Sequence, residues 1–206
     1  MTKTRVFQNG NSQALRIPQE MKTDKKDYCI NKIGDIYIAY PVDDPWAAAR
    51  QVIGTFPADF MNDREQPSWK DISVMYLLDT NICIYLMKNT YPSLTERVLA
   101  CNPADLAVSA ITVFELEYGA AKSNWGEKSR HKLAMFLSPF NILPFTSDDA
   151  VAAGRLRGHL ERLGSPIGPY DVQIAAQGLS RGMTVLTHNI GEFSRVPNLR
   201  LEDWVI

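Results

Sequence analysis

The chain has 206 residues, of which 45% are hydrophobic and 22% are charged, and its net charge is −1. This composition is ordinary for a soluble globular protein, and a chain of this length holds one or two domains. No stretch approaches the length of a membrane span, the N-terminus has no apolar signal region, and the three cysteines lack metal-ligand spacing, so we expect a reduced, cytoplasmic protein.

Charge is distributed unevenly along the chain. Residues 1–40 carry seven Lys or Arg against four Asp or Glu, residues 41–74 carry three against six, and residues 75–206 carry twelve against thirteen. A basic N-terminal part is therefore followed by an acidic segment and a balanced C-terminal part. With the motifs below, this predicts three regions, at 1–42, 43–74 and 75–206.

The first forty residues alternate like small strands around turns. Strands are predicted at 4–7 and 13–17, on either side of the turn sequence Asn-Gly-Asn-Ser at 9–12. A second pair, at 28–30 and 35–40, brackets a turn at 32–34. Because four such strands cannot bury a core alone, we expect this part to dimerise.

The stretch from Val6 to Pro18 resembles the swapped-hairpin antitoxins of the VapB type, within the AbrB-like superfamily. The resemblance implies an interlocked dimer whose exposed hairpins bind operator DNA. Cations suit phosphate contacts, and short polar side chains suit the edges of a groove. The candidate DNA-binding residues are Lys3, Arg5, Asn9, Asn11, Ser12, Gln13 and Arg16. The alternative is an ordinary turn with cations that solvate a sheet face.

Residues 43–74 combine a short predicted helix at 45–53 with scattered aromatic residues in polar, proline-containing sequence. Scattered aromatic residues without helical or strand periodicity are typical of a segment that becomes ordered only when it binds to a partner's surface. In the antitoxins that this chain resembles, the tail wraps the cognate toxin. Arg64 is the candidate inhibitory residue, because a guanidinium matches carboxylates bidentately and occupies space that a metal needs. Arg50 is the alternative, and a solvated linker arginine is the other interpretation.

From Met75 onward the pattern becomes an alternation of strands and helices. Strands are predicted at 76–78, 106–109, 141–145 and 183–187. One helix is predicted to begin at Thr80 and another to include 113–120. Two helical stretches are predicted within 125–138. Further helices are predicted at 148–163, capped by Ser147, and from Gly168 to Gly182. The sequence therefore predicts an α/β domain with a parallel sheet flanked by helices.

Four carboxylates stand out in this domain: Asp79 at the end of the first strand, Glu115 on the helix after the second, Asp171 in the first turn of a later helix, and Glu192 after the fourth strand. Carboxylates that converge repel each other unless a cation lies among them. Oxygen ligands select Mg²⁺ or Mn²⁺, which polarise a phosphate and lower the pKa of a bound water.

Residues 75–206 resemble a PIN-domain ribonuclease toxin of the VapC type. The resemblance rests on the motifs at 78–81, 114–119, 168–171, 187–193 and 199–204. It implies that Asp79, Glu115 and Asp171 are catalytic and hold the metal. The family often has an aspartate where this chain has Asn189, so Glu192 is the expected substitute. Candidates to orient the carboxylates or to face the phosphate are Thr80, Asn81, Thr187 and Asn189; a capping role is the alternative.

Other chemistries have little support in the sequence. His131, His159 and His188 are isolated, and neither a Gly-Xaa-Ser-Xaa-Gly elbow nor a glycine-rich phosphate loop is present. Glu117 is two residues from Glu115 and is expected to point elsewhere on a helix. Trp204 is expected to pack rather than to stack on bases.

The sequence as a whole indicates an antitoxin fused to a Mg²⁺-dependent endoribonuclease, with tRNA anticodon stem-loops as the substrate that the resemblance implies. A tether creates a local concentration of about millimolar. The fifteen residues from Arg64 to Asp79 reach about 50 Å, enough for inhibition in cis or of a neighbouring copy. We expect a homo-oligomer through the hairpin dimer and contacts between PIN domains. The alternatives are a DNA-binding autorepressor and a flap-type DNA nuclease.

Overall fold

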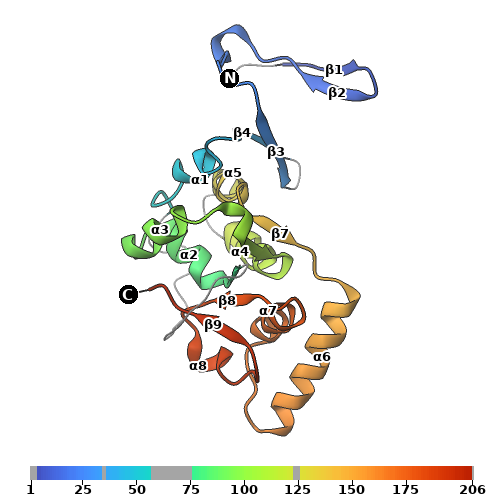
Figure 1. Ribbon diagram of the computed structural model, residues 1–206, viewed down its shortest axis with the longest axis vertical. Helices are drawn as coiled ribbons and strands as arrows, with labels where there is room; N and C mark the ends of the chain where they lie inside the picture. Colours follow the sequence, from blue (N-terminus) through green and yellow to red (C-terminus); the bar gives the residue numbers. More distant parts are fainter. Residues whose placement is uncertain (1–3, 34–35, 57–75, 123–125, 206) are drawn as a thin grey trace.

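The computed structural model describes residues 4–33, 36–56, 76–122 and 126–205 (Figure 1). Two antiparallel hairpins form the N-terminal part: β1 (Val6–Asn9) with β2 (Ser12–Leu15), and β3 (Tyr28–Ile33) with β4 (Ile36–Pro41). A 3₁₀ turn, η1 (Gln19–Met21), lies between them. The four strands expected in this part are therefore present.

The hairpins leave large apolar side chains uncovered, as expected of strands too short to bury a core. Val6 is 56% exposed, Leu15 57% and Ile30 69%. Each hairpin forms its own two-stranded sheet, and the β1–β2 hairpin stands apart from the helices (Figure 1, top). The turn of this hairpin needs Gly10, whose φ of 60° is a left-handed conformation that glycine adopts without strain.

The segment after β4 packs into the core of the C-terminal domain. It contains the short helix α1 (Ala47–Arg50), which covers less than the predicted 45–53. Trp46, Val52 and Phe56 are buried in the same cluster as the side chains of that domain. The Trp46 ring meets Phe140 edge-on, with 5.5 Å between the ring centroids.

Hydrogen bonds also tie this segment to the C-terminal domain. The Gly54 amide donates to the carbonyl oxygen of Met87 at 2.8 Å. The Lys132 ammonium donates to the Thr55 carbonyl oxygen at 2.6 Å. Residues 46–56 thus pack closely against the C-terminal domain.

A parallel five-stranded sheet forms the centre of the described C-terminal domain. Its order is β7 (Asn141–Leu143), β6 (Leu106–Ser109), β5 (Tyr76–Leu78), β8 (Thr184–Leu186) and β9 (Arg200–Glu202). The predicted parallel sheet is confirmed, but the sequence reasoning missed β9. This strand lies at the sheet edge and has two charged residues, Arg200 and Glu202, among its three. It therefore lacks the apolar run of an interior strand.

Both faces of the sheet are covered, because successive strand side chains point to opposite sides. Leu78 and Val108 face one cluster, which packs against α2 (Thr80–Lys88), α3 (Pro92–Leu99), α4 (Ala110–Lys122) and α5 (Gly126–Leu137). Leu77 and Val185 face the other, with α6 (Ser147–Arg162), α7 (Pro169–Ser180) and α8 (Ile190–Phe193). Another 3₁₀ turn, η2 (Pro103–Asp105), precedes β6.

One helix prediction was wrong, and two helices, α3 and α8, were not predicted. The region expected to hold two helical stretches contains the single helix α5, whose Leu133 and Phe136 are fully buried. Helix α3 was not predicted; it begins with Pro92, a residue suited to a first helical position, and buries Leu94 and Val98 one turn apart. Within the described residues, no helix combines the length and the apolarity that crossing a membrane requires.

The start of α6 also differs from the prediction, because Thr146 rather than Ser147 is the N-cap. Thr146 and Asp149 form a capping box, in which the Thr146 amide donates to Asp149 Oδ2 at 2.8 Å. Asp149 Oδ2 also accepts from the Arg181 guanidinium at 2.7 Å. Burial opposes ionisation of Asp149, but the hydrogen bonds from Arg181 and Thr146 outweigh it and hold the pKa of this carboxyl well below its usual value.

We expect Asp149→Asn to lower the free energy of unfolding by about 2–3 kcal/mol at neutral pH, since it breaks a cap and a largely buried ion pair. The pKa of Asp149 is lower in the folded than in the unfolded state, so its stabilisation is complete above the unfolded value, near 3.8. This stabilisation is lost as pH falls through the pKa that Asp149 has in the folded state. The difference in urea unfolding between wild type and variant should therefore shrink steadily as pH falls below about 4.

Asp148→Asn is the matched control for this experiment, because Asp148 lies in the same first turn but is exposed. We expect it to change the free energy of unfolding by less than about 0.5 kcal/mol. Equal effects of the two substitutions would contradict the special role of Asp149.

Candidate active site

The sheet reverses its strand order between β5 and β8, and α/β sheets place ligands at such points. Asp79 follows β5 directly and is the N-cap of α2, while Thr187 follows β8. The Asp79 amide donates to the Leu186 carbonyl oxygen at 2.9 Å, which holds the two strand ends together. The predicted position of Asp79 at a strand end is thus confirmed.

Asp79 is completely buried, and the groups that hydrogen bond to its carboxylate are neutral. Oδ1 accepts from the backbone amide of Thr80 at 2.7 Å. Oδ2 accepts from the Thr187 hydroxyl at 2.9 Å and from the side-chain amide of Asn81 at 3.3 Å. One turn later, burial and then the charge of Asp79 raise the pKa of the Cys83 thiol well above its usual value. A buried carboxylate with neutral donors is a strong site for a cation.

Glu115 joins this group through Thr80. Helix α4 carries Glu115 after β6, and the Thr80 hydroxyl donates to Glu115 Oε2 at 2.6 Å. Thr80 therefore holds Asp79 with its backbone amide and Glu115 with its side chain. The structure brings these two predicted carboxylates to the same edge of the sheet.

Asp171 and Glu192 meet at the start of α7. The side-chain amide of Asn189 donates to Asp171 Oδ2 at 3.3 Å. The backbone amide of Gly168 donates to Glu192 Oε2 at 2.7 Å. A Cβ atom on residue 168 would lie 2.7 Å from Asp171 Oδ2 and 3.5 Å from Glu192 Oε2. Both carboxylates thus crowd the same glycine, and a side chain here would displace Asp171.

Thr187 and Asn189 connect the two halves of the site. The Thr187 hydroxyl oxygen accepts from the Asn189 backbone amide at 2.8 Å while its proton goes to Asp79. A chain of hydrogen bonds therefore runs from Glu115 through Asp79 to Asp171. The four residues predicted to orient the carboxylates each contact at least one of them: Thr80, Asn81, Thr187 and Asn189.

The donor set fits a hard divalent cation. All four candidate ligands are carboxylates, and Asp79 and Asp171 are 0% and 2% exposed. Among the described residues, no three His, Cys, Asp or Glu side chains lie close enough together to ligate one ion as they stand. Hydrogen bonds through the threonine and asparagine side chains connect the carboxylates instead, and the ligand assignment remains a prediction.

His188 is not isolated, contrary to the sequence interpretation. Its Nδ1 contacts the buried carboxylate of Asp203, and its ring lies 6.0 Å from the Tyr85 ring and 6.1 Å from the Tyr91 ring, centroid to centroid. The pair anchors the loop that carries Thr187 and Asn189. The only sequence signal for this pair was Asp203 in the motif at 199–204. Because strand β9, which precedes Asp203, was not predicted, the pairing with His188 was not expected.

Other residues lie as the sequence indicated. Glu117 pairs with Arg130 at 3.2 Å, away from Glu115. Trp204 is 4% exposed and packs edge-on against Tyr76, so it is a packing residue. His131 and His159 are exposed.

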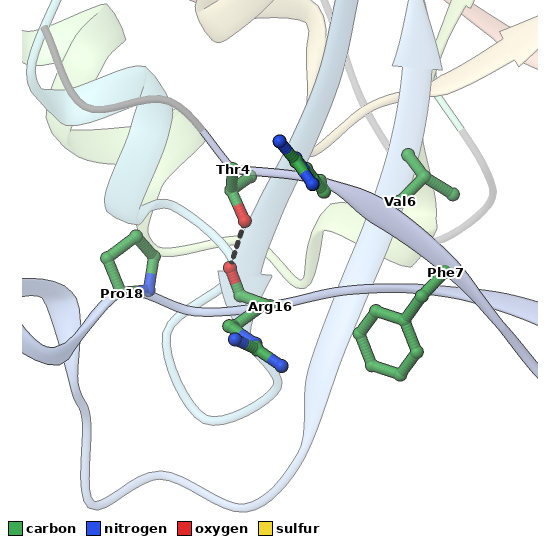
Figure 2. Close-up of a pocket in the computed structure, with 6 residues that line it drawn as sticks. Thr4, Val6, Phe7, Arg16 and Pro18 are labelled. Atoms are coloured by element: carbon green, nitrogen blue, oxygen red, sulfur yellow. Dashed lines mark hydrogen bonds between the residues drawn. The ribbon is translucent and has the colours of Figure 1, made fainter.

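The candidate DNA-binding residues that the structure describes all lie exposed on or beside the β1–β2 hairpin: Arg5, Asn9, Asn11, Ser12, Gln13 and Arg16. Arg5 and Arg16 line the same hollow, together with Val6 and Phe7 (Figure 2). The Thr4 hydroxyl donates to the Arg16 carbonyl oxygen, and Ser12 donates to the Asn9 carbonyl oxygen at 3.0 Å, so Ser12 also closes the turn. Lys3 lies outside the described residues.

The two candidate inhibitory arginines differ in what the structure shows. Arg64 lies outside the described residues. Arg50 lies exposed at the end of α1, and its guanidinium pairs with Asp44 rather than with any of the four carboxylates.

Comparison with known proteins matches residues 76–199 to the PIN domain family. The tRNA(fMet)-specific endonuclease VapC of Salmonella typhimurium is 40% identical over 129 residues, which are 63% of this chain and 97% of that protein. Ribonuclease VapC2 of Rickettsia felis is 39% identical over 132 residues, 64% of this chain and 98% of that protein. A crystal structure of DNA-bound VapBC from Salmonella typhimurium aligns with a TM-score of 0.60 at 39% identity, covering 64% of this chain and 99% of that chain.

The matched region coincides with the domain that contains the carboxylates, and the family match begins where β5 begins. The match covers 97% and 98% of the two relatives, so they consist almost entirely of this domain. The chain belongs to the PIN domain family, and its C-terminal domain is closely related to the VapC endoribonucleases.

Proposed function

We propose that this chain is a toxin and its antitoxin in one polypeptide, in which a VapC-like endoribonuclease is restrained by the segment that precedes it. The observation that carries the nuclease half is the hydrogen-bonded series of carboxylates from Glu115 through Asp79 to Asp171. The observation that supports the fusion is the burial of Trp46, Val52 and Phe56 in the core of the PIN domain.

The proposed reaction is hydrolysis of an RNA phosphodiester in the cytoplasm. Asp79, Glu115, Asp171 and Glu192 would hold Mg²⁺ or Mn²⁺, which when bound polarises a phosphate oxygen and lowers the pKa of a water molecule. Thr80 and Thr187 orient Glu115 and Asp79 through their hydrogen bonds. Asn189 supports Asp171 as a neutral donor, where the family often has an aspartate, and Glu192 supplies the fourth carboxylate.

We infer that the substrate is tRNA, cut in the anticodon stem-loop. This rests on the 40% identity to a relative named as a tRNA(fMet)-specific endonuclease. Carboxylates alone do not separate RNA from DNA, so cleavage of DNA by a flap-type nuclease is the second candidate for the same site.

For the N-terminal region we propose an AbrB-like DNA-binding dimer at 1–42 and an inhibitory tail at 43–74. The exposed Val6, Leu15 and Ile30 support dimerisation, because apolar side chains on strands this short need a second copy to cover them. Operator binding is supported by the exposed Arg5 and Arg16 and by the DNA in the structure of the related VapBC complex. PIN–PIN contacts would complete the oligomer. A chain that acts mainly as an autorepressor is the remaining alternative.

The test is to assay residues 75–206 and the full chain separately, with Mg²⁺, on tRNA and on single- and double-stranded DNA. We expect the isolated domain to cleave tRNA and the full chain to be silent on all three. Cleavage of DNA alone would establish the flap-type alternative. No cleavage of any nucleic acid by the isolated domain would favour the autorepressor.

A further inference from the structure

Three aromatic side chains lie exposed beside the carboxylates. Phe114 and Tyr118 on α4 are 51% and 57% exposed, and Tyr170 on α7 is 37% exposed. Phe114 and Tyr118 are stacked, with 6.4 Å between ring centroids and 10° between ring planes. Tyr170 meets Phe114 edge-on at 5.5 Å. The three rings therefore form one continuous aromatic row across two helices.

This row begins at the candidate active site. Phe114 directly precedes Glu115, and Tyr170 directly precedes Asp171. Residues four apart on a helix share a face, so Tyr118 continues the row one turn along α4 and Lys122 a second turn. The Lys122 ammonium lies 5.2 Å from the centroid of the Tyr118 ring. The row thus ends at a cation, and two of its rings belong to residues next in sequence to candidate ligands.

This combination fits a nucleic acid strand better than it fits an apolar protein surface. Bases stack on exposed aromatic rings whatever their identity, and a lysine at the end of such a row pairs with a backbone phosphate. An aliphatic partner would gain no advantage from stacked rings or from the cation. The position also fits, because Phe114 and Tyr170 are the sequence neighbours of the candidate ligands Glu115 and Asp171.

We propose that Phe114, Tyr118 and Tyr170 form a stacking platform for unpaired bases next to the scissile phosphate, with Lys122 on the backbone beyond them. The proposal rests on the proposed ribonuclease function. Bases in a duplex are already stacked on one another and cannot engage the rings. The platform therefore selects single-stranded loops and splayed nucleotides as the substrate class.

The test uses residues 75–206, which align with nearly the whole of the stand-alone VapC relatives. Tyr118→Leu keeps an apolar side chain but removes the ring, whereas Tyr118→Phe keeps the ring. We expect Tyr118→Leu to weaken binding of a single-stranded RNA that contains 2-aminopurine, and to lower kcat/KM on a stem-loop, by about tenfold. Tyr118→Phe should retain both, together with the fluorescence quenching that reports stacking.

Leu163→Ala is the surface control, because Leu163 is 60% exposed at the end of α6, and it should change neither quantity. Unchanged RNA binding by Tyr118→Leu would overturn the platform. If the wild-type domain binds and quenches the RNA but cleaves nothing, the platform stands and the nuclease function fails.

The competing occupant of this face is a second copy of the chain. Sedimentation of wild type and Tyr118→Leu separates the two cases. A wild-type dimer that becomes monomeric in Tyr118→Leu, with binding restored at higher protein concentration, would overturn the platform and identify a subunit interface. An unchanged oligomeric state with weaker binding supports the platform.

Discussion

Asp79→Asn in residues 75–206 is expected to reduce RNA cleavage by about 100-fold or more, the size of effect seen when one preorganised electrostatic group is removed from an active site. Asn preserves the shape of Asp79 but removes the charge to which Thr80, Asn81 and Thr187 donate hydrogen bonds. It removes a fully buried charge but also turns one accepting oxygen into an NH2 donor, and because these two effects on stability oppose each other, the domain should still fold. Cleavage rates at saturating Mg²⁺, with thermal unfolding measured in parallel, check both expectations.

Asp105→Asn is the matched control, since Asp105 lies exposed in η2, before β6. It makes the same chemical change and should leave cleavage unchanged. Wild-type rates in Asp79→Asn would refute the assignment of this carboxylate. A loss of both cleavage and folding would assign Asp79 to stability instead.

The second large effect concerns the restraint of the nuclease by its own N-terminal segment. We expect the full chain to cleave tRNA about 100-fold more slowly than residues 75–206, because a tether holds the inhibitory segment at about millimolar local concentration. Arg64→Ala in the full chain should restore most of the activity. The reason is that Arg64 is proposed to offer carboxylates a bidentate partner in place of the cation, a role that alanine cannot fill.

Arg50→Ala is the control for this prediction, because Arg50 is already paired with Asp44. It should leave the full chain silent. Activity in Arg50→Ala but not in Arg64→Ala would transfer the inhibitory role to Arg50. A full chain as active as the isolated domain would refute autoinhibition altogether, while continued silence of Arg64→Ala would remove that residue from the role.

The placement of residues 46–56 bears on how the restraint works. Trp46 contacts Phe140, and Gly54 bonds to the backbone of Met87, so this segment is anchored on the nuclease before the chain reaches Arg64. An anchored segment loses less conformational entropy when its next residues bind than a free one does. This favours inhibition in cis over inhibition of a neighbouring copy.

The sequence by itself determined the parallel sheet, the strand-end position of Asp79 and the helices that carry Glu115 and Asp171. These features depend on local periodicity and on glycine and proline positions, which neighbouring residues encode. Among the elements that the sequence pattern did not predict, two have little local contrast between apolar and polar positions. Edge strand β9 has only a half-buried Leu201, and α3 is mostly polar outside Leu94 and Val98.

Only the tertiary structure decided which side chains meet. The bridge from Thr80 to Glu115, the support of Asp171 by Asn189, the pairing of His188 with Asp203 and the burial of Trp46 in the nuclease core all join residues far apart along the chain. Such contacts depend on strand order and on the packing of helices against both sheet faces, and local sequence carries no record of either. The sequence thus marked the carboxylates, and the fold supplied the neutral donors that hold them in place.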